Sequence, residues 1–300
     1  TDYGSSVYVI DIEDNGKVIK RIDLNDVANN NIANAVPAHF VSITPDTTSK
    51  ANYKGSMVFG VDLEGKQWQL NLTDKGNLYE ITRSFDAQAT LKNDREVFFQ
   101  ETPSISNTGD LWTYYGTGNQ QRLQLISSDI DNRIYGIKDK NFPTFKNVTS
   151  LNNTESSLKN VSAAGSSCPL PSDNGWYVEL NANERVTGKL AVFNEILYAS
   201  RYKPNSGNVC SPGTASLSEH AYTCGSTTRT TTLGEGIATG VVVHKGIVYI
   251  GISGEGSGDI KDKDGKVIGK KKDNIILLKP SGSGSVGNGT ITQESWREIY

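Results

Sequence analysis

The sequence predicts an all-β protein that folds as one β-propeller, and two observations carry this prediction. The first is composition: the 300 residues include 30 glycines and 13 tyrosines but one methionine, which is typical of short strands joined by many turns. The second is a pattern that recurs along the chain, in which a hydrophobic strand with an aromatic residue is often followed by glycine and a turn. All-β folds of this length commonly form a single unit, so we expect residues 1–300 to be one domain.

The recurring pattern predicts a series of strands. They lie at Val7–Asp11, Met57–Asp62, Trp112–Gly116, Arg133–Ile137, Glu195–Ala199, Ile247–Gly251 and Asn274–Leu278. Hairpin turns are expected at residues 13–17, 62–66 and 263–266, because Asn-Gly, Asp-Gly and related pairs tolerate the positive φ of tight turns. A propeller blade takes about 40–50 residues, so the chain has room for six or seven blades. A β-sandwich would not repeat one strand signature along its whole length.

Three stretches interrupt this pattern and are expected to be long loop insertions. Residues 146–167 are rich in Asn, Ser and Thr, which predicts a long excursion or a partly helical insert. Residues 203–236 carry Pro, Gly, Ser and Thr and predict an extended loop system. Residues 281–289 are nearly pure Gly and Ser, which predicts a flexible turn before a last strand.

Charge and hydropathy argue against two classes of partner. The net charge is −3 and the basic residues are scattered apart from Lys270–Lys272, so no basic surface for nucleic acid is expected. No apolar stretch approaches the roughly 20 residues that a membrane-spanning helix needs. The chain begins at Thr1 without an initiator methionine or a signal peptide, so we expect either a mature chain or a part of a longer protein.

Three cysteines allow one disulfide. Cys210 and Cys224 flank a loop rich in Ser, Pro and Gly, and a bridge that closes a loop of ~15 residues would stabilise the fold by roughly 3 kcal/mol. The candidate disulfide is therefore Cys210–Cys224, with Cys168 left over. The alternative is three thiols in a reducing compartment, although the single Met and the three Cys agree with an exported protein.

The sequence carries no recognisable catalytic motif. The histidines, His39, His220 and His244, show no metal-ligand spacing, and no nucleophile elbow occurs. His244 follows three valines, which is typical of a strand histidine that hydrogen-bonds to a neighbour. Residues 116–118 lack the third glycine of a dinucleotide-binding motif and predict a loop. These residues argue against a hydrolase, and we name no catalytic or cofactor-binding residues.

Calcium is the one cofactor that the residues suggest. Asp259, Asp262 and Asp264 alternate before a glycine, as at the start of a calcium-binding loop. The position of the bidentate carboxylate falls on Lys271, so a plain hairpin is the favoured interpretation. Residues 128–132 offer two further carboxylates, for which a solvated turn is the favoured interpretation.

Eight short segments follow one another in an order that is informative. They are Val7–Asp11, Gly16–Asp23, Phe59–Leu70, Tyr114–Gly118, Ile134–Asp139, Gly175–Leu180, Asn183–Val186 and Ser295–Glu298. In this order they resemble the C-terminal domain of the PilY/PilC-type proteins of type IV pilus tips. That family has a Tyr-Ala-Gly-Asp-Leu-x-Gly-Asn-x-Trp-like segment at the place of residues 59–68. The resemblance spans nearly the whole chain.

The resemblance implies a modified, degenerate seven-bladed β-propeller with long loop insertions, at the C-terminal end of a longer exported protein. It implies a non-enzymatic role in pilus biogenesis, in opposing pilus retraction, and in twitching motility and adhesion. The implied location is the pilus tip, the cell surface or the outer membrane. The implied partners are the minor pilins of the tip complex, and a host-surface receptor is left open.

Many members of the family bind Ca²⁺ through an aspartate-rich loop just before the segment at residues 59–68. The matching stretch here, residues 43–55, has one carboxylate, Asp46, and two lysines. Asp46 and Asn52 supply too little negative charge, because tight Ca²⁺ sites combine several carboxylates. We therefore expect this loop to bind Ca²⁺ weakly or not at all.

Two alternative functions stay open at this point. A quinoprotein dehydrogenase is also a propeller, but it would need repeated tryptophan-docking motifs, a calcium site and usually adjacent cysteines. The chain has four tryptophans without such a repeat and no Cys-Cys pair. The other alternative is a passive outer-membrane assembly scaffold built from the same repeats. Dye-linked alcohol oxidation with added quinone tests the first, and gene deletion with scoring of surface pili and twitching tests the second.

Overall fold

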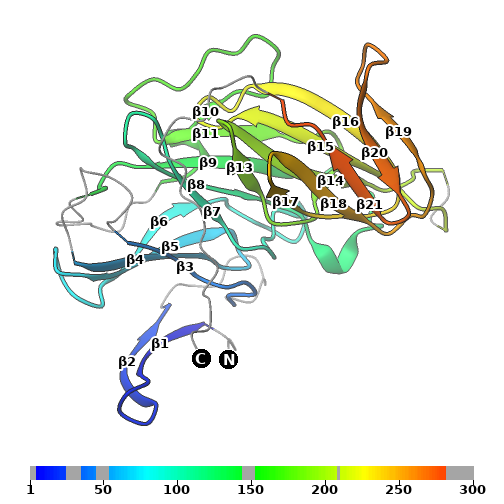
Figure 1. Ribbon diagram of the computed structural model, residues 1–300. Coiled ribbons are helices and arrows are strands. Elements are labelled where there is room, and N and C mark those ends of the chain that lie inside the picture. Colours follow the sequence, from blue (N-terminus) through cyan, green and yellow to red (C-terminus); the bar gives the residue numbers. More distant parts are fainter. Residues whose placement is uncertain (1–4, 25–34, 45–53, 144–152, 208–209, 282–300) are drawn as a thin grey trace.

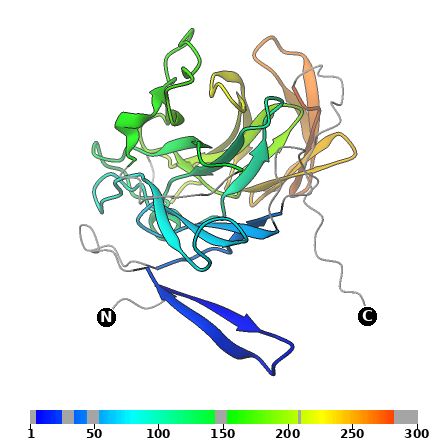
Figure 2. The ribbon, with the colours of Figure 1, turned by 90° about the vertical axis from the view of Figure 1, so that its left-hand side faces the viewer.

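The computed structural model describes residues 5–24, 35–44, 54–143, 153–207 and 210–281, and strands dominate this part of the chain. Figure 1 shows sheets of similar size lying side by side, with a separate two-stranded hairpin that projects away from them. Figure 2, a quarter turn away, shows the same hairpin standing apart from the sheets. The prediction of an all-β protein is confirmed.

The N-terminal hairpin and the first sheet come from the first third of the chain. The N-terminal hairpin pairs β1 (Ser6–Asp11) with β2 (Lys17–Asp23). The first sheet has the order β3 (Val41–Ile43), β4 (Gly55–Val61), β5 (Lys66–Thr73) and β6 (Ile81–Asp86). All pairs in this sheet are antiparallel, so short hairpins connect β4 to β5 and β5 to β6.

Three sheets of five strands follow. The second sheet has the order β10 (Lys159–Asn160), β11 (Gly175–Glu179), β9 (Arg133–Asp139), β8 (Leu111–Gly116) and β7 (Thr102–Ile105). The third sheet contains β12 (Arg185–Val186), β13 (Ala191–Phe193), β14 (Ile196–Lys203), β15 (Thr214–Ala221) and β16 (Thr227–Glu235). The fourth sheet has the order β17 (Ala238–His244), β18 (Ile247–Ile252), β21 (Ile275–Leu278), β20 (Val267–Lys272) and β19 (Gly258–Lys261).

Apolar side chains fill the spaces between neighbouring sheets. Leu217 of β15 and Ile250 of β18 belong to one buried cluster, which joins the third and fourth sheets. Trp176 of β11 and Leu197 of β14 belong to another, which joins the second and third. Two further clusters join the first and second sheets. The sheets therefore stack face to face in chain order, which is a propeller-like arrangement.

Every strand predicted from the recurring pattern is a strand in the structure, and the three predicted hairpin turns connect β1 to β2, β4 to β5 and β19 to β20. The count of seven blades is not confirmed, because the described residues form four sheets of blade size and one hairpin, and no sheet among them closes on itself.

The prediction of an extended loop system at residues 203–236 is wrong. Half of this stretch forms β15 and β16, which pair with each other from Thr214 to His220 of β15. The reason is alternation: Ala215, Leu217 and Leu233 are buried among Ser and Thr, and β-branched Thr suits a pleated surface. Of the predicted insert at 146–167, the described part contains the 3₁₀ helix η3 (Glu155–Ser157) and β10, and residues 282–289 lie outside the described part.

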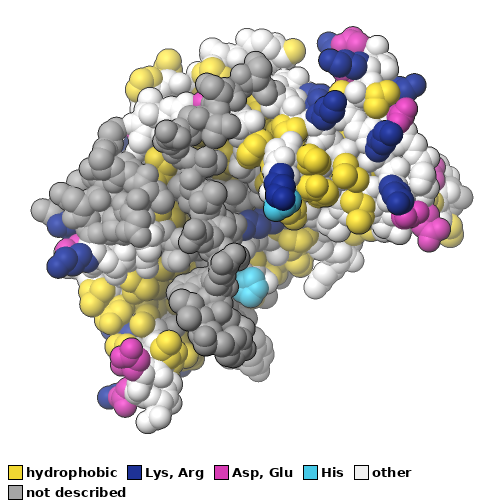
Figure 3. Space-filling model, viewed as in Figure 1, with side chains coloured by type: hydrophobic (Ala, Val, Ile, Leu, Met, Phe, Trp, Pro, Cys, Tyr) yellow, Lys and Arg dark blue, Asp and Glu magenta, His cyan; other side chains and the backbone are white. Residues whose placement is uncertain are grey.

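The outer face of the fourth sheet carries apolar side chains. Figure 3 shows hydrophobic side chains gathered over this sheet, where Val242 is 61% exposed and Ile275 is 52% exposed. Ile12 at the tip of the N-terminal hairpin is 88% exposed. Each sheet of a closed propeller is covered on both faces, so the stack formed by the described residues is open at these two ends. No helix in the described part of the chain is long and apolar enough to span a membrane.

Candidate functional site

The loop between β6 and β7 brings together the largest group of charged side chains in the described structure. Thr90 and Asn93 fix the start of the segment Asn93–Glu96, because each donates its backbone N–H to the side-chain oxygen of the other, at 2.8 and 3.0 Å. Beyond this point the side chains alternate in direction. Arg95 contacts one set of partners, and Asp94 and Glu96 contact another. One short segment therefore serves two ionic clusters.

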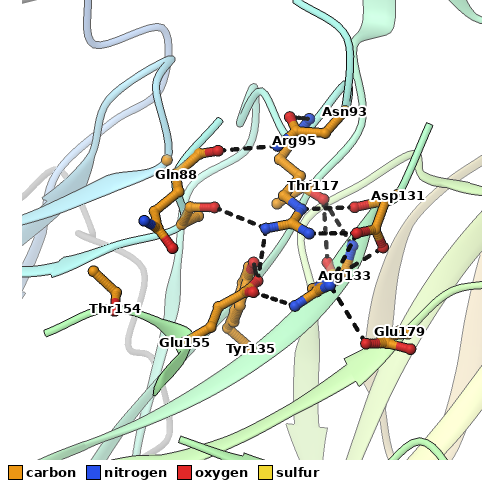
Figure 4. Close-up of polar contacts among 12 residues, drawn as sticks. Gln88, Asn93, Arg95, Thr117, Asp131, Arg133, Tyr135, Thr154, Glu155 and Glu179 are labelled. Atoms are coloured by element: carbon orange, nitrogen blue, oxygen red, sulfur yellow. Dashed lines mark hydrogen bonds and ion pairs between the residues drawn. The ribbon is translucent and has the colours of Figure 1, made fainter. Parts of the chain in front are cut away.

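Arg95 is the centre of the first cluster (Figure 4). Its guanidinium donates to the Glu155 carboxylate at 3.0 Å and to the Asp131 carbonyl at 2.8 Å, and it forms an ion pair with the Asp131 carboxylate. Arg133, at the start of β9, pairs with the same two carboxylates. It also lies over the Tyr177 ring, with 4.7 Å between guanidinium carbon and ring centroid. This cluster ties the β6–β7 loop to β9, β11 and η3.

Burial and ion pairing shift the pKa values in this first cluster. Burial tends to raise the pKa of Asp131, but the hydrogen bond from Arg133 and the charge of Arg95 hold it below its usual value. Burial raises the pKa of Tyr135 well above its usual value, and Glu155, which accepts the Tyr135 hydroxyl, raises it further. Asp131 is therefore ionised and Tyr135 protonated at neutral pH.

The second cluster is buried more deeply. The side chains of Asp94 and Arg185 are both 0% exposed, and Arg185 Nε donates to Asp94 Oδ2 at 2.8 Å. Arg122, from the 3₁₀ helix η2 (Gln120–Arg122), lies 3.3 Å from both Asp94 and Glu96. Asn119 Nδ2 donates to Glu96 at 2.8 Å. Burial lowers the pKa of Arg185 and raises that of Glu96, and the partner charges offset part of each shift.

These clusters are suited to holding loops in place. The carboxylates of Asp94, Glu96, Asp131 and Glu155 are each paired with at least one guanidinium. Within the described ranges, no three or more His, Cys, Asp or Glu residues are grouped so that they could hold a metal ion. The arrangement fixes loops from the first, second and third sheets against one another.

Sequence reasoning missed both clusters. The stretch 128–132 was expected to be a solvated turn, but Asp131 pairs with two arginines and its side chain is 41% exposed. The segment Asn93–Glu96 is not among the residues that the sequence predicts for a site. A signal was present, because three charges of alternating sign stand directly before the apolar residues 97–99. Where such charged residues are drawn into the core with the apolar run, they are almost never fully buried unless they are paired.

The candidate calcium residues lie in the hairpin between β19 and β20. Asp262 Oδ1 accepts the backbone N–H groups of Asp264 at 3.0 Å and Lys266 at 2.9 Å, so this carboxylate stabilises the turn. Asp259 lies in β19, opposite Lys270. Because lysines surround the carboxylates and the turn already engages Asp262, these residues do not fit a Ca²⁺ ion. The other candidates, Asp46 and Asn52, lie outside the described residues.

The predicted Cys210–Cys224 disulfide is wrong, because the structure joins Cys168 to Cys224. Cys210 lies before β15 and Cys224 lies after it. Eight extended residues span roughly 26 Å, so this strand keeps the two cysteines at opposite ends of the sheet. Cys168 lies instead in the loop before β11, whose Trp176 packs beside the turn that contains Cys224. Cys210 is exposed and outside the disulfide.

The histidines do not form a common site. His39 and His244 are exposed, and His244 lies in β17, in the strand predicted for it. His220 is buried, hydrogen-bonds to Ser218 Oγ at 2.9 Å and stacks on Trp176 with 6.3 Å between ring centroids. Burial, together with the charge of Arg201, lowers the pKa of His220 to about 4, so this ring is neutral at physiological pH.

Comparison with known proteins bears on the fold. No protein-family model matches the chain, and no curated protein matches it. Among solved structures, the crystal structure of the Pseudomonas aeruginosa PilY1 C-terminal domain matches with a TM-score of 0.56 and 14% sequence identity, over 83% of this chain. The chain shares the fold of the PilY1 C-terminal domain. The match spans 65% of that PilY1 chain, so this chain corresponds to less than two thirds of it.

BamB from Moraxella catarrhalis also matches, over 88% of each chain, but with 9% identity and a TM-score of 0.21. That score is too low to support a shared fold. The resemblance to the PilY/PilC C-terminal domain is thus confirmed by the PilY1 structure at the level of the fold.

Proposed function

We propose that this chain is a non-enzymatic accessory module of a type IV pilus, which supports pilus biogenesis, opposes retraction, and supports twitching motility and adhesion. The observation that carries the proposal is the fold shared with the PilY1 C-terminal domain over most of this chain. The ordered sequence segments of the same family agree with it. A complete ring of seven blades belongs to the same proposal, and the four stacked sheets are consistent with part of such a ring.

The proposed module acts through surfaces. The two ionic clusters hold loops of three sheets in place, so partner contacts need little further ordering of the backbone when they form. The proposed partners are the minor pilins of the tip complex, with a host-surface receptor as a further partner in adhesion. The exposed apolar side chains on the outer face of the fourth sheet offer additional area for contact.

The proposed location is outside the cytoplasm, at the pilus tip, the cell surface or the outer membrane. The Cys168–Cys224 disulfide supports this location, because structural disulfides persist in oxidising compartments and are rare in the cytosol. The bridge links the loop before β11 to the turn after β15, across the second and third sheets.

The direct test is deletion of the gene in its source organism. We expect fewer surface pili and loss of twitching, with pili partly restored when retraction is also disabled, because the proposed role includes opposing retraction. Immunogold labelling of the full-length protein is expected to decorate pilus ends. Normal piliation and normal twitching after deletion would overturn the proposal.

Calcium is not expected to be required for this role. The stretch that corresponds to the family's calcium loop contains one carboxylate, Asp46, beside two lysines. We predict no heat of Ca²⁺ binding in a calorimetric titration at micromolar concentration. Micromolar binding that Asp46→Ala removes would contradict this prediction.

A further inference from the structure

Two apolar surfaces are open to solvent at the two ends of the described stack. One is a face of the N-terminal hairpin, and the other is the outer face of the fourth sheet. Figures 1 and 2, a quarter turn apart, both place the hairpin away from the fourth sheet. The two surfaces therefore do not cover each other within one copy of the chain.

The open face of the N-terminal hairpin is formed by three large side chains. Tyr8 and Ile10 alternate along β1, so they lie on the same face, and Val18 pairs with Ile10 across the hairpin. These side chains are 51%, 50% and 51% exposed. A two-stranded hairpin is marginally stable in water unless further strands or packing support it. Leu24 is buried at the base of the hairpin, so the hairpin is anchored there while this face stays open.

The outer face of the fourth sheet is apolar in the same way. Strand register places Val242, Tyr249 and Leu277 in one row across β17, β18 and β21, and Ile275 lies in the next row. The opposite face of this sheet carries the buried cluster shared with the third sheet. Elsewhere in the described structure, apolar faces of this kind are buried between neighbouring sheets. The outer face therefore has the composition of a sheet-to-sheet interface.

The charges of the two surfaces are complementary. The hairpin carries four carboxylates and three cationic side chains, and three of those carboxylates lie at its tip, within residues 11–14. The stretch from β19 to β21 carries six lysines and four aspartates. On the outer face, the exposed Lys270 and Lys272 extend the rows of apolar side chains, and Asp259 stands opposite Lys270. An acidic tip and a basic margin thus accompany the two apolar faces.

We propose that the N-terminal hairpin of one copy docks on the outer face of the fourth sheet of a second copy. The hairpin continues the stack as a further sheet, at the roughly 10 Å spacing of packed sheets. Its acidic tip then lies toward the lysines of β20. When two copies exchange hairpins, both open surfaces of each copy are covered, and the assembly closes as a dimer.

The chemistry of the surfaces favours a second copy over other occupants. An anionic membrane or a nucleic acid is bound by a surface of one sign, whereas both surfaces here carry charges of both signs. A second copy brings an apolar face and the opposite charge balance together. The inference rests on these two surfaces and does not depend on the proposed role in pili.

The test is sedimentation velocity of the purified chain across the micromolar range. We expect a concentration-dependent dimer. Ile10→Asp and Val242→Asp each place a carboxylate in the contact, and each should weaken dimerisation by about tenfold or more. The matched control is Leu170→Asp, because Leu170 is 65% exposed in the loop before β11, outside both surfaces, and this variant should dimerise as the wild type does.

A mixture of the two contact variants gives the sharper result. The unchanged hairpin of Val242→Asp can dock on the unchanged fourth sheet of Ile10→Asp, so one of the two contacts is restored. The mixture should therefore dimerise about tenfold or more tightly than either variant alone. Tyr8→Ser and Ile275→Ser form a second pair of variants, which serves if either aspartate variant fails to fold.

Four results would each overturn the proposal. One is a wild-type chain that stays monomeric. Another is a dimer that both contact variants leave intact. The third is a mixture that dimerises no better than its components, because like surfaces would then meet like. The fourth is a monomeric full-length protein, since another blade of the same protein would then cover the fourth sheet.

Discussion

Two hairpin turns in this molecule share a sequence pattern and a backbone geometry but not an environment. The turn at 62–66 joins β4 to β5, and the turn at 262–266 joins β19 to β20. In each, the first aspartate accepts the backbone N–H of the closing lysine at 2.9 Å, and its own N–H donates to that lysine's carbonyl at 3.0 Å. Local sequence is therefore enough to specify this turn.

Their surroundings differ completely. In the first turn, Glu64 and Lys66 are both 0% exposed and form an ion pair with 2.6 Å between Oε2 and Nζ. Trp68 Nε1 donates to Asp62 at 2.8 Å, and Tyr115 donates its hydroxyl to the Gly65 carbonyl at 3.0 Å. The second turn points into solvent. The motif therefore sets the turn, whereas the neighbouring sheets decide what the turn contributes to stability.

The largest difference in stability between the two turns is expected when the lysine of each turn is replaced. Lys66→Met leaves the Glu64 carboxylate buried without its cation, which should lower the free energy of unfolding by about 3–5 kcal/mol. Lys266→Met changes an exposed side chain and should stay within about 0.5 kcal/mol of the wild type. Urea unfolding of both variants measures the difference. Equal losses would show that the buried pair does not distinguish the two turns.

The next largest difference between the two turns is in how the first aspartate makes stability depend on pH. Burial raises the pKa of Asp62 to about 7, although hydrogen bonds from Trp68 and Lys66 lower it in part. The folded state then holds a proton that the unfolded state releases near pH 4, so this group destabilises the fold as pH rises from about 4 to 7, by up to about 4 kcal/mol. Asp62→Asn removes this contribution.

The contribution of His220 to stability changes with pH in the opposite direction to that of Asp62, over nearly the same pH range. Its pKa is about 4 in the folded state, below its unfolded value, so its contribution to stability rises from about pH 4 to 6.5. In Asp62→Asn, the free energy of unfolding should therefore rise more steeply with pH between 4 and 7 than in the wild type. Parallel pH profiles for the two proteins would contradict the shift assigned to Asp62.

The smallest difference in stability between the two turns is expected when the glycine of each turn is replaced by alanine. Gly65 and Gly265 have φ of +71° and +79°, so Ala is strained at both, by about 1 kcal/mol. A Cβ at Gly65 would also lie 2.7 Å from the Ala87 Cβ, whereas nothing lies within 4 Å at Gly265. Gly65→Ala should therefore cost about 1–2 kcal/mol more than Gly265→Ala. Thermal unfolding of the pair measures this, and an equal loss would mean that Ala87 moves aside freely.

Features that depend on nearby residues could be predicted from the sequence, whereas features that depend on packing between sheets could not. Turns and strands depend on nearby residues, so the pattern around Asp62 and Asp262 predicted both hairpins. The Cys168–Cys224 bridge depends on packing between the second and third sheets, which no local pattern contains. The ion pair of Asp94 with Arg185 joins residues 91 positions apart. The composition of Thr-rich β16 is typical of a loop, whereas its alternation of buried and exposed side chains specifies a strand.

If this fold serves a type IV pilus, as we propose, complementation of the deleted gene should restore surface pili. The full-length gene would be supplied as wild type, Lys66→Met or Lys266→Met, and surface pili would be counted. We predict that the wild type and Lys266→Met restore pili, whereas Lys66→Met, which destabilises the buried turn, restores few. Equal numbers of pili with and without the gene would contradict the claim.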